Sequence, residues 1–140
     1  PGDPIPTLPR NTESARFADQ TGIEAREDIL VYSTEAFQAD TLLQGCVKLR
    51  FYASSSAVDT DFAAKLLLVH PDGRAVEIYA TLLRARYRHG RKPEFLTPGE
   101  IVPYEIEIGN VCLNVAKGYG LRLEISSCLF PLADRNTNLV

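Results

Sequence analysis

An alternation of apolar and polar residues, rather than a helical repeat, dominates most of the chain. From Val47 to Ala53, apolar side chains occupy every second position, and Lys, Arg and Tyr occupy the positions between them. The same period of two returns in 104–108 and 121–126. Successive side chains of a strand point to opposite faces, so each of these segments is predicted to be a strand.

Three other segments are also predicted to be strands. Ile29–Ser33 is short and compact, and Phe62–Val69 is apolar on both faces except at Lys65. A strand that is apolar on both faces is expected at the centre of a sandwich. The turn residues Pro71-Asp72-Gly73 then predict a hairpin with a strand that runs from Ala75 to about Arg86.

The whole pattern predicts an all-β protein of about eight strands, with no helix of four turns. Many short strands separated by turn signals favour an antiparallel β-sandwich over a parallel α/β sheet. Jelly-roll and immunoglobulin-like topologies are both compatible with the pattern. Residues 1–20 are rich in proline and polar residues, which predicts an extended arm or a linker from a preceding domain, followed by one sandwich domain at 21–140.

The composition excludes several classes of partner. The chain has 140 residues, an apolar share of 45% and a net charge of −3, with both signs spread along the sequence. This balance argues against nucleic acid and anionic membrane surfaces as partners. No apolar run approaches the roughly 20 residues that a membrane-spanning helix needs.

Cys46, Cys112 and Cys128 lie far apart, and none belongs to a Cys-x-x-Cys pair. They are predicted to be reduced thiols packed as small apolar residues, with neither a disulfide framework nor a zinc site. A reducing compartment follows, so the cytoplasm is the expected location.

Motifs for catalysis are absent from the sequence. No Gly-x-Ser-x-Gly motif is present to hold a nucleophilic serine on a strained turn. The two histidines, His70 beside a turn and His89 among basic residues, are poorly placed to act as a general base. Glycine loops for nucleotides are also absent. The chain is therefore predicted to have no triad of its own and no cofactor.

Asp59 and Asp61 flank Thr60 just before a predicted strand. One interpretation is a calcium site, because an Asp-x-Asp pair supplies oxygen ligands. The favoured interpretation is structural, in which the carboxylates bind backbone amides or arginines, and an interdomain contact is the third. No metal is expected, because the residues that follow supply no further oxygen ligands.

Arg84, Arg86 and Arg88 are predicted to share one face of a strand. Such a row could bind phosphate groups, but Glu105 and Glu107 repeat the same spacing on the next strand. Cross-strand pairs between the two rows are therefore predicted.

Near the C-terminus, Asp134, Arg135 and Asn136 place a carboxylate beside a guanidinium and an amide in a loop. Such pairs are expected to order the loop.

Several ordered blocks resemble one known family. The segments 59–74, 120–127 and 130–136 are similar to the C-terminal non-catalytic domain of the cocaine esterase and X-Pro dipeptidyl-peptidase (CocE/NonD) serine hydrolases. Segment 24–34 resembles the entry strand of that domain, and 41–45 resembles the turn that follows. The resemblance implies a jelly roll of the galactose-binding-domain-like type.

The resemblance also implies partners. Family members carry an α/β-hydrolase domain with a serine triad and a helical cap, and this domain packs against both. Thr7, Leu8 and Phe17, in the arm between domains, are the candidates for reaching a substrate pocket. Asp59, Asp61, Arg84, Arg86 and the 134–136 loop are candidates for interdomain or structural contacts, and a homo-oligomer is possible.

A free-standing binding module, for carbohydrate for instance, is the alternative. Carbohydrate sites usually present aromatic platforms, and the absence of tryptophan weakens this interpretation.

Overall fold

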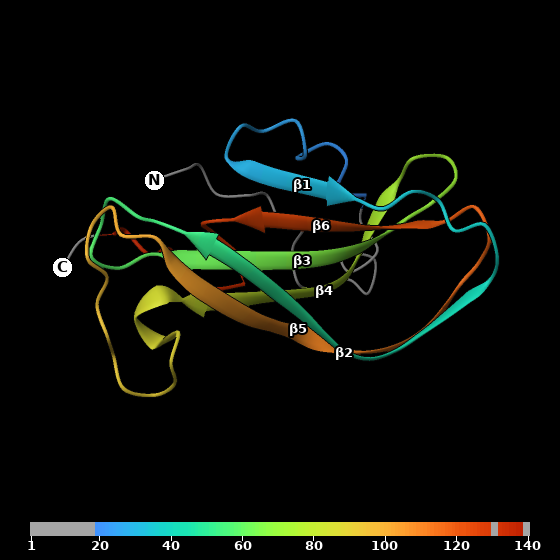
Figure 1. Ribbon diagram of the computed structural model, residues 1–140. Coiled ribbons are helices and arrows are strands. Elements are labelled where there is room, and N and C mark those ends of the chain that lie inside the picture. The colour runs from blue at the N-terminus through green and yellow to red at the C-terminus, as the bar shows by residue number, and fades with distance from the viewer. Residues whose placement is uncertain (1–18, 130–131, 139–140) are drawn as a thin grey trace.

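The computed structural model describes residues 19–129 and 132–138. Its named elements are β1 (Ile29–Ser33), β2 (Thr41–Ala53), β3 (Asp61–Val69), β4 (Ala75–Arg84), the 3-10 turn η2 (Ala85–Tyr87), β5 (Val102–Val115) and β6 (Gly120–Ser126). One sheet has the order β1-β6-β3-β4, and β2 and β5 form a second sheet (Figure 1). All strand pairs are antiparallel, so the predicted all-β sandwich is confirmed.

The pairing of strands is nested along the chain. β3 pairs with β4, β2 with β5, and β1 with β6. The outer pair β1–β6 and the inner pair β3–β4 lie in one sheet, and the middle pair β2–β5 lies in the other. A long hairpin folded over two layers in this way is the arrangement of a jelly roll. No helix in the described part of the chain is long and apolar enough to cross a membrane.

The described residues form six strands, fewer than the eight expected, because two of the strands are unusually long. Residues 41–45, which resemble a turn, are instead the start of the 13-residue strand β2. β5 has 14 residues. Its pairing with β2 shifts register between Val47 and Lys48 of β2, but both strands continue past this point. A β-bulge of this kind bends a strand without ending it.

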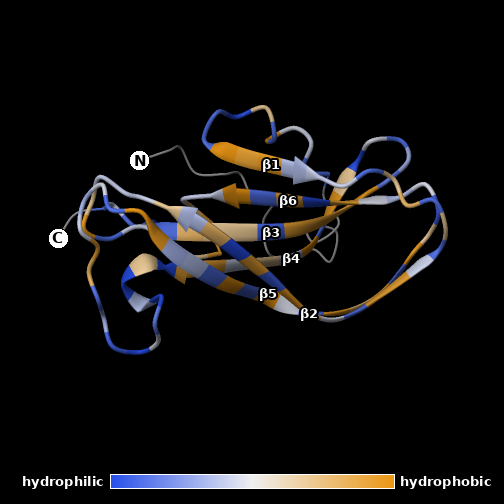
Figure 2. Ribbon diagram, viewed as in Figure 1, coloured by the Kyte–Doolittle hydropathy of each residue, from blue (hydrophilic) through white to orange (hydrophobic). Residues whose placement is uncertain are grey.

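The core lies between the two sheets, where the apolar faces of their strands meet. Apolar and polar positions alternate along β2 and β5 in Figure 2, and the apolar positions of β5 are the buried ones. At one end of the core, the rings of Phe51, Phe62 and Tyr104 pack with centroid distances of 4.7–5.2 Å. Aromatic contacts of this kind add stability beyond the area that they bury.

The β3–β4 hairpin forms where the turn residues predict it. The backbone of His70 donates to the carbonyl of Arg74 at 2.8 Å, and Gly73 donates to the carbonyl of His70 at 2.9 Å. Gly73 has φ of 91°, a conformation that side chains with a Cβ rarely adopt. The strand that follows ends at Arg84, slightly earlier than expected.

Cys46 and Cys112 differ from the prediction, because both thiols are exposed rather than packed inside. They lie on β2 and β5, at positions that point away from the core. All three cysteines of the chain are free thiols, and Cys128 is partly buried.

Gly109 brings β5 close to a ring of the other sheet. A Cβ at this position would lie 2.9 Å from two ring atoms of Tyr79, whose hydroxyl donates to the carbonyl of Asn110 at 2.6 Å. We expect Gly109→Ala to displace the ring and to lower the free energy of unfolding by about 1–3 kcal/mol. Chemical denaturation measures the change. Gly22→Ala is the control, since its Cβ would meet no atom within 4 Å, and equal losses in both variants would contradict this account.

Candidate functional site

Asp59 and Asp61 lie at the centre of a partly buried polar cluster. Asp61 is 1% exposed and accepts hydrogen bonds from Nε and Nη2 of Arg84 at 3.0 and 3.2 Å. Asp59 accepts from the backbone amide of Arg86 at 3.0 Å. The amide nitrogen of Asn136 lies 3.1 Å from Asp61 Oδ1 and 3.4 Å from Asp59 Oδ2. The cluster thus joins the end of β4 and the C-terminal segment to the start of β3.

The electrostatics of the cluster agree with its geometry. The hydrogen bond to Asp61 raises the pKa of Arg84, and burial acts in the opposite direction. The carboxylates of Asp59 and Asp61 therefore accept hydrogen bonds from two arginine residues. The side chains of Arg84 and Arg86 keep 33% and 30% exposure, so each presents one side to solvent. An interdomain contact through these arginines stays a prediction.

The remaining candidate residues fall into two groups. Asp134 and Arg135 are exposed on the segment that carries Asn136. The possible substrate-pocket residues, Thr7, Leu8 and Phe17, fall outside the described residues.

The predicted pairing of the arginine row with Glu105 and Glu107 is wrong. Glu105 lies 2.7 Å from Arg50 and 3.1 Å from Lys48, both on β2. The reason is topological, since the chain crosses to the other sheet between β4 and β5. The three arginines also do not share one strand. Arg84 ends β4, Arg86 lies in the 3-10 turn η2, and Arg88 follows that turn.

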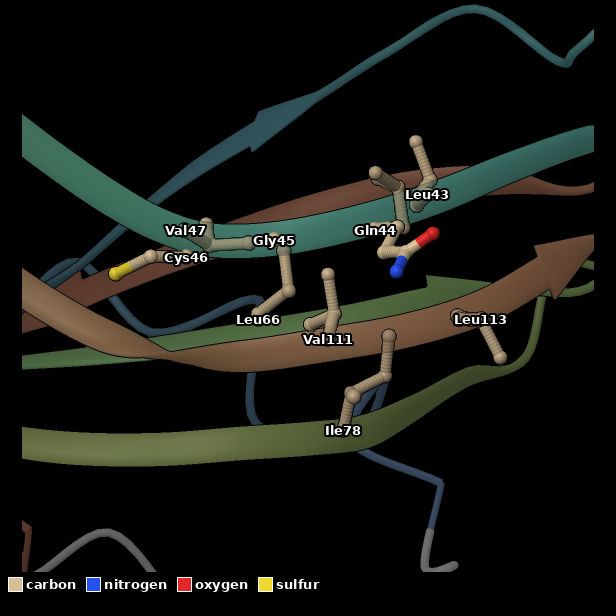
Figure 3. Close-up of a pocket in the computed structure, with 10 residues that line it drawn as sticks. Leu43, Gln44, Gly45, Cys46, Val47, Leu66, Ile78, Val111 and Leu113 are labelled. Carbon is tan, nitrogen blue, oxygen red and sulfur yellow. The ribbon is translucent and has the colours of Figure 1, made fainter.

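A groove follows β2 between the two sheets. One hollow of about 180 Å³ is lined by 43–47 of β2 and by apolar residues that include Leu66, Ile78 and Val111. Figure 3 shows these three side chains lying below β2, with the thiol of Cys46 pointing away from them. A second hollow of about 320 Å³ shares Val47 and Leu66 with the first. The two hollows are therefore neighbours along β2, and we call them together the β2 groove.

The inner faces of β1 and β6 form one wall of the β2 groove. Leu121 and Leu123 of β6 line it together with Tyr32 of β1. Tyr32 is 56% exposed and Leu30, on the same face of β1, is 55% exposed. The second sheet has only two strands in the described part of the chain, so it leaves this apolar wall uncovered.

The edge of β2 forms the opposite wall. Three consecutive residues, 47–49, line the hollow. Alternate side chains of a strand point to opposite faces, so a hollow on one face would be lined by every second residue. Three consecutive lining residues therefore indicate that the hollow lies at the edge of β2. Within the described residues β2 pairs only with β5, so this edge offers unpaired backbone groups beside an apolar wall.

A buried ionic group on the other face of the four-stranded sheet was not predicted. Lys65 and Glu124 face each other in register on β3 and β6, and each is 2% exposed. Residues 19–28, which we call the strap, cover them. Asp19 bridges to Val76 at the edge of β4, and Gln20 accepts from Lys65 at 2.9 Å. The sequence shows Lys65 as the one charged residue in the predicted apolar strand. Its partners Gln20 and Glu124 are distant in sequence, so the pattern could not predict them.

Comparison with known proteins places the chain among domains of larger hydrolases. Residues 4–139 match the family model of the X-Pro dipeptidyl-peptidase C-terminal non-catalytic domain. The chain is 40% identical over 146 residues to cocaine esterase of Rhodococcus sp. (strain MB1 Bresler), a match that covers 99% of this chain and 25% of the relative.

Solved structures of longer proteins contain a similar fold. An aminopeptidase from a marine sediment Thaumarchaeota archaeon matches with a TM-score of 0.87 and 28% identity, over 99% of this chain and 26% of that one. An α-amino acid ester hydrolase matches with a TM-score of 0.86 and 25% identity, over 99% and 25%. The chain therefore spans about a quarter of the length of these relatives. With a family model matched over nearly its whole length, the chain belongs to the family of X-Pro dipeptidyl-peptidase C-terminal non-catalytic domains.

Proposed function

We propose that this chain is the accessory β-sandwich of a serine hydrolase whose catalytic residues lie outside these 140 residues. The observation that carries the proposal is the family match over 4–139, joined to relatives about four times as long whose names describe hydrolases. In the longer protein the nucleophilic serine and its histidine would lie on an α/β-hydrolase domain. The reaction would then be hydrolysis of an acyl ester or an X-Pro peptide through an acyl-enzyme.

The β2 groove is the surface that we assign to the contact with the catalytic domain. An apolar wall next to an unpaired strand edge suits an extended segment, because backbone groups of the segment bind the edge while its side chains fill the hollows. This chain covers a quarter of its relative's length, and we assign the segment to the part of the longer protein outside these 140 residues. Association within one chain needs no separate partner, since the effective concentration of the segment is high.

A carbohydrate-binding module is the weaker alternative. The groove is lined mainly by aliphatic side chains, and Tyr32 is the aromatic residue in its lining. No platform of stacked aromatic residues is present in that lining.

A fluorophosphonate probe tests the assignment of the nucleophile. We expect the longer protein to be labelled on a serine outside these residues, and the 140-residue chain to remain unlabelled by intact-mass spectrometry. Hydrolysis of a p-nitrophenyl ester by the isolated chain should equal the rate in buffer. Stoichiometric labelling of any serine within the chain would contradict the proposal.

A further inference from the structure

Five charged side chains gather beneath and within the strap. They are Lys65 of β3, Glu77 of β4, Arg122 and Glu124 of β6, and Glu24 of the strap. With all of them ionised, the group has two positive and three negative charges, and therefore one uncompensated negative charge. An uncompensated charge away from water is costly, which favours the uptake of one proton.

Glu124 is the most deeply buried carboxylate of the group, and its contact with Lys65 is long. Lys65 donates its hydrogen bond to Gln20 at 2.9 Å, and its Nζ lies 3.8 Å from Glu77 and 3.9 Å from Glu124. Both carboxylate oxygens of Glu124 are buried, and neither has a hydrogen-bond partner. The facing residue of β1 is Val31, and β1 contains no charged residue that could compensate Glu124.

Glu24 is the neighbour that can complete the set of hydrogen bonds. Its Oε2 accepts a hydrogen bond from Arg122, and its Oε1 is buried without a hydrogen-bond partner. Arg122 and Glu124 are two positions apart on β6, so their side chains share one face of the sheet, and the bond to Arg122 brings Glu24 next to Glu124. Two ionised carboxylates are both acceptors, so a hydrogen bond between them needs a proton on one. We propose that Glu24 and Glu124 share one proton, and that this proton fastens the strap to the sheet until alkaline pH removes it.

The titration of Glu124 agrees with this geometry. Burial, with a smaller contribution from Glu24 and Glu77, raises the pKa of Glu124 from 4.5 to about 7, although Lys65 acts in the opposite direction. The folded state therefore binds a proton at pH values where the unfolded state has released it. The stabilisation is complete below pH 4.5 and is lost as the pH rises through about 7.

Hydrogen exchange of the strap tests the proposal in the 140-residue chain. The amides of Gln20, Ile23 and Arg26 donate backbone hydrogen bonds that depend on the strap remaining in place. Corrected for intrinsic exchange, their protection should fall on the order of 100-fold between pH 5 and pH 8.5. Glu124→Gln keeps a neutral donor in the gap, so its protection should change little over this range.

Glu27→Gln is the matched control, because it removes an exposed carboxylate from the same strap, and it should follow the wild type. An equal pH dependence in Glu124→Gln and wild type would overturn the proposal. Carboxyl ¹³C titration of the wild-type chain decides the question even if the variant does not fold. A shared proton predicts a step near pH 7 at the carboxyl of Glu124. A step for Glu124 below pH 5 would overturn it.

Discussion

Replacing Arg84 with alanine is expected to lower the free energy of unfolding by about 3 kcal/mol. Asp61 is 1% exposed and relies on two hydrogen bonds from this guanidinium, at 3.0 and 3.2 Å. Without the arginine, the carboxylate stays buried with Asn136 as its remaining side-chain donor. The loss is therefore dominated by an uncompensated buried charge. Urea denaturation of the wild-type and variant chains measures it.

Arg74→Ala is the matched control for Arg84→Ala. Arg74 binds Asp72 at 2.8 Å through the same Nε atom, but both side chains are 56% exposed. Water replaces an exposed partner at little cost, so the unfolding midpoint should hardly change. Similar losses in the two variants would show that burial of Asp61 does not determine the stability of the cluster.

If the β2 groove binds the proposed catalytic domain, replacing Tyr32 with aspartate should uncouple this domain from the rest of the longer protein. Tyr32 is 56% exposed in the 140-residue chain and lies in the apolar wall of the β2 groove. Burying an aspartate there without a partner should weaken the domain contact by about 2 kcal/mol, the loss typical of a central aromatic residue. Calorimetry of the longer protein should then resolve two unfolding transitions in place of one.

Tyr52→Asp provides the control for Tyr32→Asp. Tyr52 is 78% exposed on β2, is absent from the lining of the groove, and carries the same penalty for aspartate in a strand. It should leave the longer protein with its original transition. Both variants should have a similar, small effect on the isolated chain. Uncoupling by Tyr52→Asp, or none by Tyr32→Asp, would contradict the assignment of the groove.

Local patterns were sufficient to predict most of the strands. The alternation through 47–53 and 121–126 and the turn at Pro71-Asp72-Gly73 depend on neighbours in sequence, and the structure places strands and a hairpin there. Asp59, just before β3, and Asp61, its first residue, were also open to a structural interpretation, because carboxylates at the start of a strand can bind arginines.

Features that depend on distant pairing could not be predicted in this way. The arginines of 84–88 and Glu105 were predicted to lie on neighbouring strands. The chain instead crosses to the other sheet between β4 and β5, so Glu105 lies beside Lys48 and Arg50. Likewise, Lys65 and Glu124 become partners only through the register of β3 with β6. The β2 groove forms because the four-stranded sheet extends beyond the two-stranded sheet. The number of strands in each sheet cannot be predicted from the pattern of any one segment.

In our proposal, this β-sandwich binds the catalytic domain along the β2 groove. Exchange of the backbone amides in the groove is the most direct test of that contact. Hydrogen exchange would be measured on residues 30–33 and 47–49, first in the 140-residue chain and then in the longer protein. If a segment of the hydrolase adds to the strand edge, these amides should exchange at least tenfold more slowly in the longer protein. Unchanged rates at both segments would contradict the account.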